Sequence, residues 1–140
     1  MPTDSYIEKA KEFFAADFFA QKNGIELIEV SSGGARVSMQ IEERHKNSHG
    51  TVHGGALFTL ADCAFALASN SHGIPASAIN AHISYMTAAK EGVLIADAEE
   101  FALNHKLATY TVTITDENEN KIAIFQGTVY RKTPRRDASE

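Results

Sequence analysis

An apolar stretch at residues 56–68 constrains the fold more than any other part of the sequence. Its letters, ALFTLADCAFALA, are apolar nearly all the way round a helical wheel and are interrupted only by Thr59 and Asp62. A helix of this pattern is usually buried on all sides, and this one is too short and too polar to span a bilayer. We therefore predict a buried helix over residues 54–71, which the rest of the chain has to surround.

Strand patterns fill most of the remaining sequence. Residues 107–115 alternate between apolar side chains and threonines, which is the period of a half-buried strand. Five more segments are strand-like, at residues 25–30, 35–41, 79–86, 93–101 and 122–130. Their short connections favour antiparallel pairing. The sequence therefore predicts an α+β fold in which an antiparallel sheet wraps around a central helix.

A second helix is expected at the start of the chain, over residues 4–23. Its apolar residues follow the helical period, and Asp17 is the one break in that stripe. The paired phenylalanines at positions 13–14 and 18–19 either line a pocket or cover the sheet, and core packing is the favoured interpretation. Residues after Lys132 are expected to form a frayed tail.

Size and charge narrow the class of protein. The 140 residues suit a single domain, 1–140. The net charge of −5 argues against nucleic-acid or anionic-membrane partners, because both require a basic face. A lone cysteine, Cys63, excludes an internal disulfide, and the N-terminus lacks a signal peptide. These features favour a cytoplasmic protein. No cofactor is predicted.

Asp62 is the functional candidate within the apolar helix. Burying a carboxylate without a partner is costly, so an ionisable group kept in such a place is a candidate for chemistry. The alternative is a structural aspartate that bonds to a nearby amide or hydroxyl. Cys63, its neighbour, is expected to be an inert core residue.

The loop before the helix, residues 47–55, reads NSHGTVHGG. A glycine-rich helix start presents backbone N–H groups that have no internal partner, and the helix dipole there favours negative charge. Such a start can stabilise an oxyanion. Gly54 and Asp62 are eight residues apart, or about 12 Å along a helix. One carbonyl group cannot easily reach both, so we predict an active site shared between two subunits with antiparallel helices.

Histidines in this region do not predict a metal site. His45, His49 and His53 are spaced by four, but the glycines argue against a helix that would align them. The chain has neither an HExxH motif nor a Cys/His cluster.

With the spacing Asn47-x-x-Gly50-x-x-His53-Gly54-Gly55 and the later Ala61-Asp62, the sequence resembles hotdog-fold thioesterases of the phenylacetate-degradation (PaaI) type. The resemblance implies a dimer, usually paired into a homotetramer, that hydrolyses acyl-CoA thioesters. It makes Asp62 the general base or nucleophile and the Gly54 amide the group that polarises the carbonyl, with Gly55 as the alternative. Asn47 and His53 would shape the site.

Further contacts are less specific. Some members carry a serine or threonine on the strand after the helix, where Ser77 is the nearest candidate and Ala78 the competing occupant. Lys90 and Lys106 could hold the CoA phosphates, or be solvated surface charges. The acyl group would be aromatic, such as a phenylacetyl derivative, or of medium chain length. The alternative functions are a hydratase or dehydratase on the same fold, and a non-catalytic acyl-CoA binder.

Overall fold

The computed structural model describes residues 4–134. The elements follow one another in the order α1 (Asp4–Ala15), α2 (Phe18–Lys22), β1 (Ile25–Ser31), β2 (Gly34–Gln40), the 3₁₀ turn η1 (Glu43–His45), α3 (Gly54–Ser69), β3 (Ala76–Tyr85), β4 (Val93–Leu103), β5 (Leu107–Thr115) and β6 (Lys121–Arg131). The expected central helix and all six expected strands are therefore present. The expected C-terminal tail lies mostly outside the described residues.

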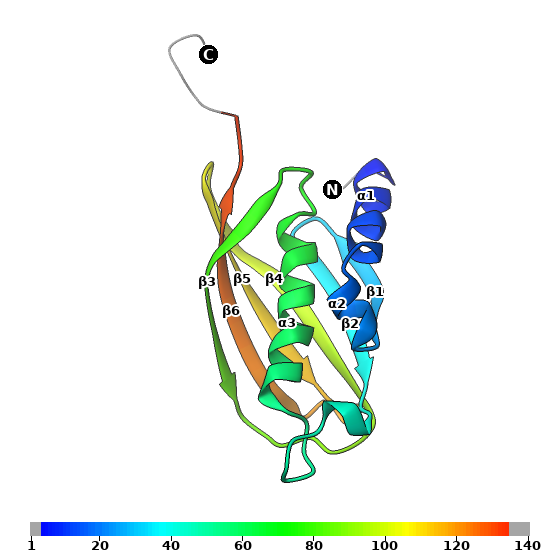
Figure 1. Ribbon diagram of the computed structural model, residues 1–140. Coiled ribbons are helices and arrows are strands. Elements are labelled where there is room, and N and C mark those ends of the chain that lie inside the picture. Colours follow the sequence, from blue (N-terminus) through cyan, green and yellow to red (C-terminus); the bar gives the residue numbers. More distant parts are fainter. Residues whose placement is uncertain (1–3, 135–140) are drawn as a thin grey trace.

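The six strands form one antiparallel sheet in the order β1-β2-β4-β5-β6-β3. The sheet curves around α3, which contacts every strand, while α1 and α2 lie beside α3 above β1 and β2 (Figure 1). The predicted α+β architecture with a central helix is confirmed.

Side-chain alternation in the strands builds the core. On β5, the side chains of Ala108, Tyr110, Val112 and Ile114 are at most 2% exposed, whereas the intervening threonines lie on the outer face. The ring of Phe65, from α3, packs edge-on against Tyr110 and tilted against Phe125 of β6. These contacts fix the position of α3 on the sheet, because close-packed rings resist displacement.

The prediction of one continuous helix over residues 4–23 is wrong, because two helices occupy this segment. The chain breaks after Ala15, and a second helix starts at Phe18 with Asp17 as its N-cap, whose carboxylate accepts a 3.0 Å hydrogen bond from the Ala20 N–H. Aspartate favours this capping position. The preference for core packing of the phenylalanine pairs is also wrong for Phe13, Phe18 and Phe19, which are 45%, 70% and 67% exposed.

The prediction that α3 is buried on all sides also requires correction. Most of its residues are buried, but one face remains open, and this face carries Gly55, Thr59, Asp62 and Ala66. In the protomer, Asp62 itself is exposed. The open face lies between β3 and the α1–α2 pair (Figure 1).

Strand β3 lies at the edge of the sheet and pairs only with β6. Seven of its ten residues are exposed. In the described part of the chain, no helix is long and apolar enough to cross a membrane.

Candidate active site

Asp62 lies halfway along the open face of α3. Its carboxylate is exposed, yet the apolar surroundings limit its hydration and raise its pKa, and the negative charge of Asp17 raises it further. A raised pKa makes the ionised carboxylate a stronger base, which is useful for activating water or attacking a carbonyl. Asp62 is therefore better suited to chemistry than to a structural ion pair, and no such pair involves it among the described residues.

The N-terminus of α3 is organised by His53. This residue is the N-cap, and its Nδ1 accepts a 2.8 Å hydrogen bond from the Gly55 N–H. The bond requires a bare Nδ1, so the ring carries its proton on Nε2. The Gly55 amide is thereby occupied. Within residues 4–134, the Gly54 N–H has no acceptor. Of the two glycines, only Gly54 therefore has a backbone N–H available to donate a hydrogen bond to a substrate.

A buried imidazole supports His53 from behind. The backbone N–H of His53 donates to the carbonyl oxygen of His45 at 2.7 Å. His45 is 2% exposed, its Nδ1 accepts from the Glu42 N–H, and its Nε2 lies 2.8 Å from the carbonyl oxygen of Asn23. Both ring nitrogens are therefore engaged in fixing the loop to the end of α2. No group of three metal-ligating side chains occurs in the described part of the chain.

Tyr85 is a site residue that the sequence interpretation missed. It ends β3, and its hydroxyl donates a 3.2 Å hydrogen bond to the carbonyl oxygen of Gly54. A Cβ at position 54 would lie 3.1 Å from the tyrosine ring, so a larger residue there would require the ring to shift by a few tenths of an ångström. Tyr85, Gly54 and Asn47 line one cavity of about 310 Å³ beside the helix start. The only sequence signal was an aromatic residue at the end of a strand.

Asn47 holds the loop in shape. Its Oδ1 accepts hydrogen bonds from the backbone N–H of His49 at 2.9 Å, from the backbone N–H of Thr51 at 3.2 Å and from the Thr51 hydroxyl at 3.3 Å. Its carboxamide oxygen is therefore used within the loop, and a contact with substrate would fall to its Nδ2 group.

The register of β3 decides between Ser77 and Ala78. Residues directly paired across strands share a face of the sheet. Ala78 pairs with buried Val129 and so faces α3, whereas Ser77 pairs with the exposed Tyr130 and faces away. Of the two candidates, Ala78 therefore faces the helix, and Ser77, the predicted substrate-binding residue, faces away from it.

The two lysines lie at opposite ends of the molecule. Lys90 is exposed and follows Ala89, whose carbonyl oxygen accepts from the Val52 N–H just before α3. Lys106 lies in the β4–β5 turn, and its ammonium group is 5.5 Å from the centre of the Tyr130 ring. This turn lies at the same end of the molecule as the C-terminal end of α3 (Figure 1). Only Lys90 lies near the Gly54 end of the helix within one protomer.

Cys63 is poorly suited to act as a nucleophile. Its side chain is 3% exposed, and burial raises the pKa of its thiol to about 12, with smaller contributions from the charges of Asp17 and Asp62. The thiolate is the reactive form. The expected inert core cysteine is consistent with these properties.

The site thus combines a helix-terminal amide without an acceptor and a carboxylate of raised pKa on one open helix face. The chain as a whole is similar to known proteins. The thioesterase superfamily model matches residues 49–123, more than half of the chain. A putative esterase of Archaeoglobus fulgidus is 42% identical over 127 residues, covering 89% of this chain and 82% of the relative. The acyl-coenzyme A thioesterase PaaI of Escherichia coli is 32% identical over 125 residues, covering 89% of both chains.

A solved structure gives the same result for the fold. The PaaI protein of the E. coli phenylacetic acid degradation operon superposes with a TM-score of 0.90 at 30% identity, covering 95% of this chain and 97% of the other. The fold is thus the hotdog fold. The chain belongs to the thioesterase superfamily, as its resemblance to PaaI-type enzymes implied.

Proposed function

We propose that this protein hydrolyses acyl-CoA thioesters, with aromatic or medium-chain acyl groups, to the free acid and CoA. The observation that carries the proposal is the Gly54 N–H, which lacks an acceptor, at the start of the helix that bears Asp62. The names of the relatives support the same activity, since the E. coli relative is called an acyl-coenzyme A thioesterase.

In the proposed reaction, the thioester carbonyl oxygen accepts a hydrogen bond from the Gly54 N–H, and the helix dipole stabilises the developing negative charge. Ionised Asp62 then either takes a proton from an attacking water or attacks the carbonyl carbon itself. The C–S bond breaks, and the thiolate of CoA leaves and takes up a proton. In the first route the oxygen of the attacking water becomes part of the product acid. In the second route the attack forms a mixed anhydride between Asp62 and the acyl group, and water then cleaves this anhydride to release the acid and regenerate the Asp62 carboxylate.

The proposed site needs two copies of the chain. Gly54 and Asp62 are eight residues apart on α3, which corresponds to about 12 Å along its axis. In a two-fold dimer with antiparallel α3 helices, Gly54 of one protomer faces Asp62 of the other. The unpaired edge of β3 supports this arrangement, because an exposed strand edge is a template for pairing with a second chain.

The expected oligomeric state comes from the resemblance to PaaI-type enzymes, and the expected cellular location comes from the amino-acid composition. We expect two dimers to form a homotetramer. We place the protein in the cytoplasm, because a reducing compartment suits a chain with one free, buried thiol.

The first test is release of free thiol from a panel of acyl-CoAs. Asp62→Asn keeps the size of the side chain and removes the charge, and it is expected to abolish turnover with the fold retained. Asp97→Asn is the matched control, because Asp97 is a carboxylate on the outer face of the sheet, bonded to Arg36 at 3.5 Å. Undiminished turnover by Asp62→Asn, or hydration of an enoyl-CoA without thiol release, would contradict the proposal.

The amide is tested at Gly54. Gly54→Pro deletes the N–H, and proline is favoured at the first helical position. His53, with φ −62° and ψ 138°, already has the conformation that proline requires of the preceding residue. Gly54→Ala keeps the N–H and adds the same Cβ beside Tyr85. We expect Gly54→Pro to lower kcat about 10²–10³-fold and Gly54→Ala to lower it far less. Equal losses would show that the Cβ, and not the missing N–H, is responsible.

Mixing the two inactive variants tests the shared site. A mixed dimer of Asp62→Asn and Gly54→Pro has one site with both defects and one intact site. Random mixing of equal amounts should therefore recover about a quarter of the wild-type activity. No recovery after exchange of subunits would place both groups of each site in one protomer.

A further inference from the structure

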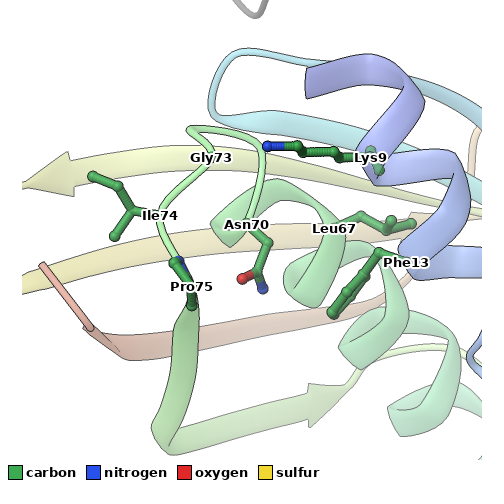
Figure 2. Close-up of a pocket in the computed structure, with 8 residues that line it drawn as sticks. Lys9, Phe13, Leu67, Asn70, Gly73, Ile74 and Pro75 are labelled. Atoms are coloured by element: carbon green, nitrogen blue, oxygen red, sulfur yellow. The ribbon is translucent and has the colours of Figure 1, made fainter. Parts of the chain in front are cut away.

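A second cavity, distinct from the one at the helix start, lies between α1 and the C-terminal end of α3 (Figure 2). Its volume is about 230 Å³. Its walls come from α1, from α3 and from the loop that leads to β3, through Ala10, Phe13, Leu67, Asn70, Ile74 and Pro75. None of the steps proposed above uses this cavity.

The cavity walls are mostly apolar, and the polar side chain that reaches them from the end of α3, Asn70, has its polar atoms bonded to the backbone. The Asn70 Nδ2 donates to the carbonyl oxygen of Ala66 at 2.9 Å, and its Oδ1 accepts from the Ala76 N–H at 3.0 Å. Its polar groups are thus engaged with the backbone. Lys9 extends along the rim toward Gly73 (Figure 2), where its methylene chain can cover apolar surface.

The cavity lies farther along the helix face that carries Asp62. Asp62, Ala66 and Asn70 follow one another at intervals of four residues, so they lie along one side of α3. Ala66 is partly exposed, and its side chain is a single methyl group, so it fills little space between Asp62 and the cavity. The segment from α1 to α2 runs beside α3. Phe13 of α1 lines the cavity, and Asp17, which caps α2 just after α1 ends, is close enough for its charge to act on Asp62.

We infer that this cavity holds the end of the acyl chain and selects medium-chain acyl groups. The inference rests on the proposed acyl-CoA hydrolysis and names the substrate class of that site. Leu67 and Asn70 lie five and eight residues beyond Asp62, which is about 7.5 and 12 Å along the helix. An extended chain advances about 3.6 Å for every three bonds, so its end reaches the cavity after roughly six to ten bonds. This length matches acyl chains of about eight to ten carbons.

The volume agrees with that length. An apolar protein cavity of about 150 Å³ accommodates benzene, so this larger cavity can hold the last several carbons of a chain. A phenylacetyl group spans only five bonds from its carbonyl carbon to the far edge of its ring, and it would end before the cavity.

The test is a chain-length profile of kcat/KM for acetyl-, hexanoyl-, octanoyl-, decanoyl- and phenylacetyl-CoA. The wild type should prefer octanoyl- or decanoyl-CoA. In Ala66→Leu, the leucine side chain blocks the path. At about fourfold per buried methylene, losing three methylenes from the cavity should lower the octanoyl-to-acetyl ratio roughly 50-fold. Phe13→Ala enlarges the cavity and should move the optimum toward longer chains.

The control is Ala102→Leu, the same substitution at an exposed position of β4, which should keep the wild-type ratio. Thermal unfolding checks that each variant folds. A flat wild-type profile, a preference for phenylacetyl-CoA over octanoyl-CoA, or equal losses for acetyl- and octanoyl-CoA in Ala66→Leu would overturn the inference and leave the hydrolytic function standing. Absence of hydrolysis for every acyl-CoA would instead refute the function itself.

Discussion

The N-cap of α3 allows a quantitative test of how the helix start serves the site. In His53→Ala, the Gly55 N–H loses the 2.8 Å hydrogen bond that it now donates to the imidazole Nδ1. Replacing an N-cap side chain by alanine costs about 1 kcal/mol, within a range of roughly 0.5–2 kcal/mol. For a domain of this size, this corresponds to a fall in Tm of about 3–5 °C.

The same substitution should lower turnover. Without its cap, the first turn of α3 frays, and the Gly54 amide no longer has a fixed direction. His53→Asn provides the matched variant, because asparagine is a strong N-cap. We expect it to restore the Tm, and also to restore most of kcat if His53 acts only by holding the helix start. Thermal unfolding and thiol release measure the two effects in the same samples.

Two results would refute this reasoning. An unchanged Tm in His53→Ala would mean that the imidazole does not stabilise the helix. A variant His53→Asn with wild-type Tm and no activity would mean that the imidazole touches the substrate, since restoring the cap had not restored turnover. In that case His53 would be a catalytic residue in addition to its capping role.

Three further predictions concern the core and the charges around the site. A Cβ at Gly127 would lie 2.6 Å from Cζ of Phe65, whose ring is packed between two other rings. Gly127→Ala should therefore lower the free energy of unfolding, measured by urea titration, by about 1–3 kcal/mol. An unchanged free energy would mean that the ring moves freely. Asp17→Asn removes the negative charge that helps raise the pKa of Asp62 and keeps a good N-cap, so the acidic limb of the kcat/KM profile should move to lower pH. A limb that stays in place would exclude this coupling. The buried thiol of Cys63 should not react with a thiol reagent at about pH 8 until the protein unfolds, and rapid labelling of the native protein would contradict its burial.

The sequence predicted the fold well because periodicity carries that information. The threonine alternation of residues 107–115 marked β5 to the residue, and the apolar run at residues 56–68 marked α3. The sequence pattern also marked the break between α1 and α2, which the prediction of one helix missed. Asp17 interrupted the apolar stripe of the predicted first helix, and the structure shows that it does so because it caps α2.

Other features depend on contacts that no local pattern records. An apolar helix looks equally buried on every side, and only the packed structure shows that the face with Asp62 and Ala66 is open. The β-bulge after Ala78 fixes which residues of β3 face the helix, and a bulge changes that alternation without a sequence marker. Tyr85 reaches Gly54 across 31 positions of chain, so its role appears only when the strand is placed beside the helix.

The length of α3 has an evolutionary consequence under the proposed arrangement. A protomer that carries the amide at one end of the helix and the carboxylate two turns away is inactive when alone, and its bare β3 edge also makes it prone to aggregate. Mutations that weaken subunit pairing would then lose turnover and solubility together. Selection for hydrolysis alone would therefore be enough to keep the monomer from accumulating.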